Sequence, residues 1–396
     1  MISIKTQISL CVAAAIACGS AMADEHDKHQ PRIPHLDHVF LIMLENHAYD
    51  QIIGNSDAPF INQMAKQKNL ATNFFAVGHP SLTNYLEVVG GSNFGVINDH
   101  SPDWHNTNCT PNLVSGIPSD ESVAAPICPI AGSGMDAATV AVDTTNEGTP
   151  ANPVYNQPLA AAPTVGKTIA DQLVAAGMSW KTYQEDLGIG GPDRVNAGDG
   201  AFTNLSPVNK ANLVAKYAVK HNPFIYFANV QSNTDPDNGF NNMADFTGLN
   251  GLYADLATGK VPNFSFIAPN QCHDMHGQSN AGAFCGYDDP APNNNPALIQ
   301  AGDNAVQKLV TAIEQSDVWK EGKNAIVVMF DENDYSSQPN KVVTIVETNY
   351  GKNGVQSSKP YNHFAMLKTL EAGFGLDCLN HACDKNVATM NDLFSR

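Results

Sequence analysis

Short runs of apolar residues recur along this chain, and each run is followed by a polar cluster or by a helix-like stretch. Apolar runs of about four to eight residues, bounded by turn signals, are typical of strands that are buried on both faces. Strands of this kind are found mainly in parallel sheets, where helices cover both sides. The runs that we interpret as strands are residues 39–44, 73–77, 224–228, 264–268, 325–330 and 342–346.

Stretches with helical patterning lie between these runs, at residues 59–67, 82–89, 165–176, 296–316 and 363–372. Alternating strands and helices predict an α/β fold with a mostly parallel central sheet and helices on both of its faces. Residues 101–164 differ, because they are rich in Pro, Gly, Ser, Thr, Asn and Ala and show little periodicity. We interpret them as a long, loop-rich insertion that covers a site.

The beginning of the chain has the features of a secretory signal peptide. Lys5 precedes an apolar stretch at residues 8–17, and Ala21 and Ala23 form a small-x-small cleavage signal. We therefore expect residues 1–23 to be removed, residues 24–396 to form a single domain, and the protein to be periplasmic or secreted. No other stretch reaches the roughly eighteen consecutive apolar residues of a membrane-spanning helix, so no transmembrane segment is expected.

The formal net charge of −18 limits the partners of this chain. A strongly acidic protein is a poor ligand for nucleic acid, whose phosphates repel it. A small substrate is therefore favoured, while the number of subunits is left open.

The number of cysteines after residue 23 is even, which predicts disulfides in an exported protein. A zinc site held by cysteines is disfavoured, because the sequence contains no Cys-x2-Cys spacing. Nearest-neighbour pairing would join Cys109 to Cys128, Cys272 to Cys285 and Cys378 to Cys383, although other connectivities stay open.

Polar clusters follow the predicted strands at the point where each strand ends. Glu45 and Asn46 follow the first strand, and Asp331 and Glu332 follow a late one. In open α/β sheets, ligands bind beyond the carboxyl ends of the strands. Converging carboxylates repel each other unless a cation neutralises them, and oxygen ligands suit hard divalent ions. Loop solvation and helix capping are the alternative explanation for any single cluster.

Ser81 stands at the start of the predicted helix 82–89. A serine at this position is commonly a helix cap. The free N–H groups of a helix N-terminus also favour an anion, and a nearby cation would make the hydroxyl a better nucleophile. Ser81 is therefore a candidate nucleophile for attack on a phosphorus atom.

Six motifs occur in order along the chain, namely FLIMLENHAYDQIIG, GHPSLTNYLEVVGGSNFG, KHNPFIYF, FIAPNQCHDMHG, VVMFDENDYS and NHFAMLKTLE. Together they resemble the bacterial phosphoesterase family. The family contains secreted acid phosphatases and phosphatidylcholine-preferring phospholipases C, and it belongs to the alkaline-phosphatase-like superfamily. The resemblance implies an alkaline-phosphatase-like fold and runs from about residue 37 to residue 371.

The family pattern implies a role for particular residues of this chain. One divalent metal ion, which could be calcium, magnesium, manganese or zinc, would be held by Glu45, Asn46, Ser81, Asp331 and Glu332. Phosphate oxygens would be met by His79, Asn84, His273 and Asp274, and the leaving group would be protonated by His276 or His363. Thr83 replaces the proline of the family's His-Pro-Ser-x-Pro-Asn pattern, which makes it a second candidate nucleophile, but the spacing to Asn84 favours Ser81.

These residues together predict a metal-dependent phosphoric ester hydrolase that works through a phosphoseryl intermediate, of the acid-phosphatase type, with a small phosphorylated substrate. A phospholipase C acting on phosphatidylcholine-like lipids is the alternative enzyme. It is disfavoured because those enzymes read Glu-Asn-Arg-Ser-Phe-Asp where this chain reads Glu45-Asn46-His47-Ala48-Tyr49-Asp50. A non-catalytic periplasmic metal-binding protein is the alternative of a different class.

Overall fold

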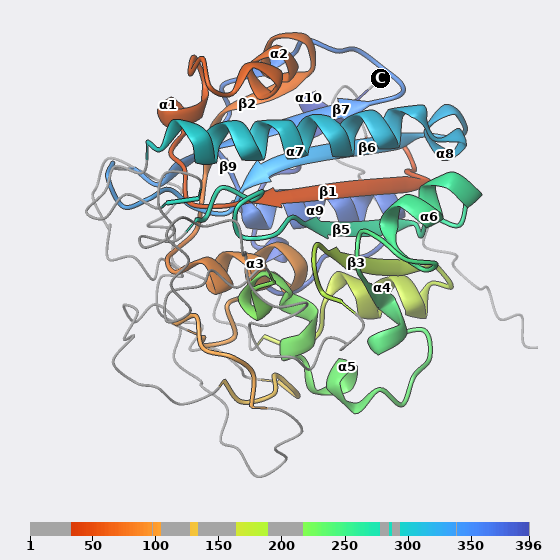
Figure 1. Cartoon of the computed structure of the whole chain (residues 1–396). Coiled ribbons are helices and arrows are strands. Elements are labelled where there is room, and N and C mark those ends of the chain that lie inside the picture. Colours follow the sequence, from red (N-terminus) through yellow and green to blue (C-terminus); the bar gives the residue numbers. More distant parts are fainter. Residues whose placement is uncertain are drawn as a thin grey trace, which may run out of the picture.

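The computed structural model of the chain describes residues 33–96, 98–103, 127–133, 164–188, 217–277, 285–286, 294–337 and 339–395. Its centre is one sheet with the strand order β4-β3-β5-β1-β6-β7-β2-β8, and β9 also pairs with β2 (Figure 1). The strands are β1 (His38–Leu44), β2 (Asn69–Phe75), β3 (Trp180–Gln184), β4 (Met243–Ala244), β5 (Phe264–Ala268), β6 (Asn324–Phe330), β7 (Lys341–Thr348), β8 (Gln356–Ser357) and β9 (Tyr361–Asn362).

The sheet is mostly parallel, as the apolar runs predict. β1 lies between β5 and β6 and is parallel to both, and β3 continues the parallel array beyond β5. Only β7, among the described strands, runs against its neighbours β6 and β2. Because β1, β5, β6 and β2 run in the same direction, the polar clusters that follow them lie along one edge of the sheet.

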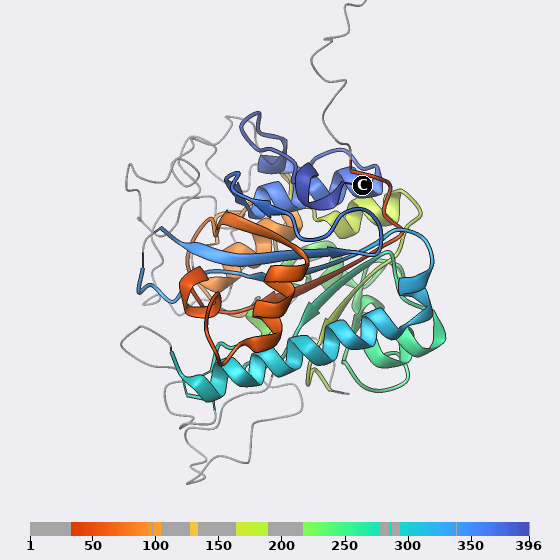
Figure 2. The same ribbon diagram turned by 90° about the horizontal axis from the view of Figure 1, so that it is seen from above.

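Helices cover both faces of the sheet. α2 packs against α7 on one face, and α3, α4 and α9 pack against one another on the other face. Figure 2 shows this layering, with α7 in cyan on one side and α9 in blue on the other. The longer helices are α2 (Pro59–Gln67), α3 (Ser81–Gly90), α4 (Ile169–Ala175), α6 (Leu252–Thr258), α7 (Pro296–Gln315) and α9 (His363–Phe374). The short ones are α1 (Tyr49–Ile52), α5 (Ala228–Ser232), α8 (Asp317–Lys320), α10 (Asn391–Phe394) and the 3-10 turns η3 (Val219–His221), η4 (Pro223–Tyr226), η5 (Phe240–Asn242) and η6 (Asn380–Cys383).

Local sequence signals explain where these helices begin and end. Pro59 and Pro296 occupy the first turns of α2 and α7, where a missing N–H costs nothing. The side chain of Asn362 accepts a hydrogen bond from Ala365 N and caps α9, which ends at Gly375 with a φ of 72°. The side chain of Thr168 caps α4 in the same way, so this helix starts later than the predicted residue 165.

One predicted strand is wrong, and several short strands were not predicted. Residues 224–228 form η4 and the start of α5 rather than a strand. Phe224 is fully buried and packs its ring against Trp180 and Phe266, with ring centroids 4.5 and 5.8 Å apart. An apolar run therefore predicted burial correctly but not the backbone conformation, because Pro223 starts a tight turn here. The strand β3 was missed because polar Lys181 and Gln184 interrupt its apolar pattern.

Two of the predicted disulfides are present, Cys272–Cys285 and Cys378–Cys383. The third pairing, with Cys109, lies outside the described residues, as do most of residues 101–164.

Within the described part of the chain, none of the helices combines the length and apolar character needed to cross a membrane.

Candidate active site

Ser81 is buried at the beginning of α3 and faces the residues that follow β1. Its Oγ lies 2.8 Å from Glu45 Oε2 and 3.4 Å from Asn46 Oδ1. A third acceptor, Glu332 Oε1, lies 3.2 Å away and comes from the segment after β6. The folded chain thus brings together oxygen atoms from three segments that are far apart in the sequence.

This crowding of acceptors fits a bound cation. A serine hydroxyl has one proton, so Ser81 can donate to only one of the three oxygens at a time. The remaining oxygen contacts are repulsive in a buried site unless a positive charge lies among them. Carboxylate, amide and hydroxyl oxygens are also the atoms that hard divalent ions prefer.

Asp331 completes this oxygen set and is itself fixed by the backbone. Its Oδ1 accepts hydrogen bonds from Asn46 N at 3.2 Å and from Glu332 N at 2.6 Å. Its Oδ2 is buried and has no hydrogen-bond partner among the described residues. Burial and the nearby Glu45 carboxylate raise the pKa of Asp331, and burial raises the pKa of Glu45 to about 7. Buried carboxylates of this kind ionise fully only when a cation compensates them.

His79 and Asn84 hold Glu332 and the loop before Ser81 in place. His79 Nδ1 lies 2.7 Å from Glu332 Oε2, and the His79 ring stacks on Tyr335 with centroids 3.8 Å apart. Asn84 Nδ2 donates to Gly78 O at 2.8 Å and to Glu332 Oε2 at 3.1 Å, while its Oδ1 accepts from Gly78 N at 3.0 Å. The side-chain amide of Asn84 thus fixes the position of Gly78, in the loop that leads to Ser81, and links it to Glu332.

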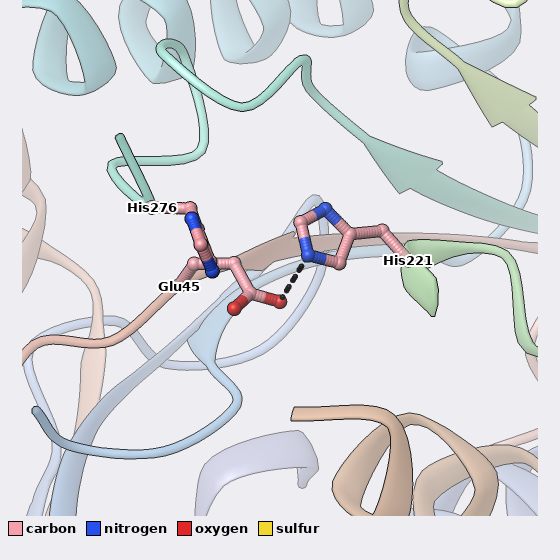
Figure 3. A group of neighbouring side chains, drawn as sticks. All are labelled: Glu45, His221 and His276. Atoms are coloured by element: carbon pink, nitrogen blue, oxygen red, sulfur yellow. Dashed lines mark ion pairs between the residues drawn. The ribbon is translucent and has the colours of Figure 1, made fainter. Parts of the chain in front are cut away.

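His221, from η3, joins Glu45 to Asp274. Its Nδ1 lies 3.0 Å from Asp274 Oδ2, and its Nε2 lies 3.2 Å from Glu45 Oε1. An imidazole whose Nδ1 lies beside a carboxylate can turn the Nε2 lone pair toward a metal ion, which is how histidine commonly binds metals. Figure 3 shows His221 and His276 converging on Glu45, and these three residues form a group that could hold a metal ion. A cation here would have nitrogen as well as oxygen ligands.

Lys220 lies beside His221 and reaches the same cluster. Its Nζ is 2.7 Å from Asp99 Oδ2, 3.0 Å from His276 Nε2 and 3.5 Å from Ser81 Oγ. Burial lowers the pKa of Lys220, but the carboxylates of Asp99 and Glu45 outweigh this effect and raise it above its usual value. The side chain is therefore a buried, charged ammonium.

His276 faces Lys220 as a hydrogen-bond acceptor. Its Nδ1 lies 2.7 Å from Gly277 O, and a carbonyl can only accept, so Nδ1 carries the proton. Burial and the neighbouring Lys220 lower the pKa of His276 to about 3, which keeps the ring neutral. In this arrangement Nε2 accepts from Lys220.

For the other two predicted histidines, His273 and His363, no contact with Ser81 is found among the described residues. His273 is part-exposed and pairs with Glu185, with Nδ1 2.8 Å from Oε2. His363 is buried at the start of α9, where its Nδ1 accepts a long hydrogen bond of 3.4 Å from Val77 N. Its ring also meets Phe74 edge-on at 5.6 Å. His363 thus supports the strand that leads into the serine loop.

Thr83, the second candidate nucleophile, points back into its own helix. Its Oγ1 donates to Pro80 O at 2.8 Å, as helix residues often do. Of the predicted metal residues, Glu45, Asn46 and Glu332 contact Ser81 Oγ, and within the described part of the chain none is found in contact with the Thr83 hydroxyl.

Sequence reasoning missed three residues of this cluster, namely Asp99, Lys220 and His221. Lys220 and His221 open the motif KHNPFIYF, which contributed to the family resemblance without being given a role. They follow no predicted strand, so their position in the sequence does not mark them as polar groups at a strand end.

Comparisons with known proteins agree with the motifs. The family model described as "Phosphoesterase family" matches residues 55–377. A probable acid phosphatase of Kluyveromyces lactis is 25% identical over 88% of this chain and 61% of its own length. A phosphatidylinositol-3-phosphatase of Mycobacterium tuberculosis is 25% identical over 88% of this chain and 81% of its own length. An acid phosphatase of Aspergillus fumigatus is 23% identical, and the match covers 57% of that protein.

This chain thus spans about three fifths of the two fungal relatives. Among solved structures, a protein of the alkaline phosphatase superfamily from Vibrio parahaemolyticus matches 93% of this chain and 71% of its own, with 13% identity and a TM-score of 0.45. The family prediction made from the six motifs is confirmed by the family model, whose match covers most of the sequence. This chain belongs to the phosphoesterase family.

Proposed function

We propose that this protein hydrolyses phosphomonoesters in a metal-dependent reaction, with Ser81 as the nucleophile and a phosphoseryl intermediate. The observation that carries the proposal is the placement of Ser81 Oγ against three acceptor oxygens, from Glu45, Asn46 and Glu332, at the carboxyl edge of the sheet. Ser81 follows Pro80, the N-cap residue of α3, and its Oγ faces side chains from other segments of the chain rather than the N–H groups of its own helix.

The residues around Ser81 suggest how the chain itself takes part. Glu45, Asn46, Asp331 and Glu332 would hold the metal ion together with Ser81, and His221 offers it a nitrogen ligand beside Glu45, while the Nε2 lone pair of His276 is directed to Lys220. A divalent ion at such a site stabilises negative charge on phosphoryl oxygens and favours the ionised form of a nearby hydroxyl. The Ser81 proton is directed to Glu45 Oε2, 2.8 Å away.

In the proposed reaction, Ser81 Oγ attacks phosphorus in line with the departing ester oxygen. The Oγ–P bond forms as the P–O bond to the leaving alcohol breaks. Water then hydrolyses the phosphoseryl group and releases phosphate. Proton donation to the alcohol by His276 or His363 stays a prediction. The geometry gives His276 the part of an acceptor for Lys220, and it places His363 behind the serine loop.

The relatives support a phosphatase rather than another esterase, since three of those named above are acid phosphatases or a phosphatidylinositol phosphatase. We also propose that the protein works outside the cytoplasm. The support is the pair of disulfides, Cys272–Cys285 and Cys378–Cys383, because disulfides persist mainly in oxidising compartments.

The test is covalent trapping. Wild-type protein is incubated with a 32P-labelled phosphomonoester, quenched in acid and digested, and the label is expected on the peptide that contains Ser81. Ser81→Ala should lower kcat by at least about a thousandfold, the scale on which covalent nucleophiles act. Thr83→Ala is the matched control and should keep most of the activity, because Thr83 bonds only Pro80 O among the described residues. Label on Thr83, or an active Ser81→Ala variant, would contradict the proposal.

A further inference from the structure

The ammonium group of Lys220 is held in a fixed position. Its side chain is 14% exposed and forms an ion pair with Asp99, whose side chain is 19% exposed. The Nζ–Oδ2 distance is 2.7 Å, and a second contact joins Nζ to His276 Nε2 at 3.0 Å. Because the Nδ1 proton of His276 is directed to Gly277 O, Nε2 offers the lysine a lone pair.

An ammonium group has three N–H donors, and these two contacts engage two of them. The third partner within reach is Ser81 Oγ, at 3.5 Å. This distance is long for a hydrogen bond, and Ser81 is closer to Glu45 Oε2 at 2.8 Å. Among the residues that the structure describes, Lys220 is the one cationic side chain for which a contact with Ser81 is found. Its third donor is thus available to an oxygen atom brought next to Ser81.

Asp99 fixes this ammonium relative to the nucleophile. While its Oδ2 pairs with Lys220, its Oδ1 accepts a hydrogen bond of 2.9 Å from Leu82 N, in the first turn of α3. Ser81 begins the same helix. The Asp99 carboxylate therefore links the Lys220 ammonium to α3, the helix that begins with Ser81. This link restricts the movement of the long lysine side chain relative to Ser81.

We propose that Lys220 binds a non-bridging oxygen of the phosphoryl group and thereby selects phosphomonoesters over phosphodiesters, with Asp99 as the residue that positions it. This inference rests on the proposed function of Ser81. A phosphomonoester dianion carries charge on three non-bridging oxygens during transfer. In a diester one of those oxygens is esterified, so it carries no such charge and has a carbon substituent attached. A fixed ammonium facing the third oxygen therefore stabilises the monoester reaction more than the diester reaction.

The experiment compares kcat/KM for p-nitrophenyl phosphate and bis-p-nitrophenyl phosphate in wild-type protein and in Lys220→Gln. Loss of one preorganised donor to a charged oxygen typically costs about a hundredfold in rate, so this is the fall expected with the monoester. The diester should change by less than about fivefold, because it lacks the charged third oxygen. The monoester-to-diester ratio therefore falls. An equal loss with both substrates, or an unchanged ratio, overturns the inference.

Asp99→Asn provides a second variant that keeps the size of the side chain and its contact with Leu82 N. It weakens the hold on Lys220, so the same ratio should fall by about tenfold, less than in Lys220→Gln. If Lys220→Gln does not fold, as judged by circular dichroism, the ratio in Asp99→Asn decides. A general loss of stability would lower both activities together and leave the ratio unchanged.

Lys181→Gln is the matched control. Lys181 is a part-buried lysine on β3 that pairs with Asp255 of α6, as Lys220 pairs with Asp99. Its removal should leave the monoester-to-diester ratio at the wild-type value.

The proposed function and the role of Lys220 are contradicted by different results. If wild-type protein hydrolyses neither ester, or Ser81→Ala is active, the proposed function fails. If Ser81→Ala is inactive and Lys220→Gln leaves the ratio unchanged, only the role of Lys220 fails.

Discussion

Ser81 Oγ lies 2.8 Å from Glu45 Oε2, although 36 residues separate them in the sequence. The contact exists because β1 and β2 end at the same edge of the sheet, where Glu45 follows β1 and the loop after β2 leads to Ser81. Glu332 reaches the same hydroxyl from the end of β6. Three connections of the fold thus determine the environment of one hydroxyl group, and each can be tested by changing a residue that supports it.

Asp331→Asn should reduce metal binding while leaving the fold intact. The amide keeps an oxygen for Asn46 N and Glu332 N, but the negative charge and the buried Oδ2 are lost. A metal ion at about a hundred times its Kd stabilises a protein by about 2.7 kcal/mol, and this gain should disappear. Metal content by mass spectrometry and melting curves with and without added Mn²⁺, Mg²⁺, Ca²⁺ or Zn²⁺ provide the measurement.

The control for this variant is Asp303→Asn. Asp303 is a buried carboxyl that accepts hydrogen bonds from Phe60 N and Ile61 N at the start of α2. Its loss should lower the melting temperature without changing metal content. Full metal content in Asp331→Asn would show that Asp331 is not a ligand.

Asn84→Asp should loosen the loop that carries Ser81. The substitution replaces the Nδ2 donor by an oxygen that faces Gly78 O and Glu332 Oε2. Buried groups that lose their partner in this way cost about 1–3 kcal/mol, and the extra charge near Glu332 adds repulsion. We expect a lower melting temperature together with a lower kcat. The control is Thr83→Val, one residue earlier in α3. It should lower the melting temperature only slightly and leave kcat unchanged. Equal effects of Asn84→Asp and Thr83→Val would contradict this role of Asn84.

Replacing Cys272 and Cys285 by alanine should lower both stability and activity. The bond closes a loop with a sequence separation of 13 and clamps the segment that carries Asp274 and His276. Loops of this size give about 3 kcal/mol in the chain-entropy description. The double variant Cys378→Ala/Cys383→Ala opens the shorter loop, with a separation of 5, and should keep the wild-type kcat. Chemical denaturation and steady-state kinetics on both double variants distinguish them, and an unchanged kcat after loss of Cys272–Cys285 would contradict the positioning role.

Glu371 should make the protein less stable as pH rises. Burial within α9 raises the pKa of its carboxyl from 4.5 to about 9, so the folded state keeps a proton that the unfolded state loses. The folded state binds more protons between these two values, and its free energy of unfolding therefore falls with pH across this window. The fall amounts to about 3 kcal/mol between pH 4.5 and pH 7 for one such group.

Glu371→Gln should remove this pH dependence, since an amide has no proton to lose. Its melting temperature should match the wild type near pH 4.5 and exceed it at pH 8. Thermal melts across pH 4.5–9 measure the effect. A wild-type curve that runs parallel to that of the variant would show that Glu371 does not titrate in this way.

Much of the fold can be predicted from the sequence because local patterns specify it. The buried strands β1, β5 and β6 are continuous apolar runs, and Pro59 and Pro296 mark where α2 and α7 begin. The oxygen-rich part of the site was equally visible, since Glu45-Asn46 and Asp331-Glu332 directly follow such runs. Residues that directly follow parallel strands lie at the same carboxyl edge of the sheet, so their position in the sequence predicts that they are close together in the fold.

The rest of the site was decided by tertiary structure. Lys220 and His221 follow no strand, and they reach Ser81 and Glu45 because a 3-10 turn packs against α3. Nothing in the local sequence shows that Asp99 would pair with Lys220, 121 residues away. Periodicity and capping depend on neighbours along the chain, and so the sequence by itself determined most of the strands and helices and the positions of the acidic residues that follow β1 and β6. Contacts between distant loops depend on how the helices pack on the sheet, and for this reason only the folded chain placed the buried ammonium group of Lys220 next to Ser81.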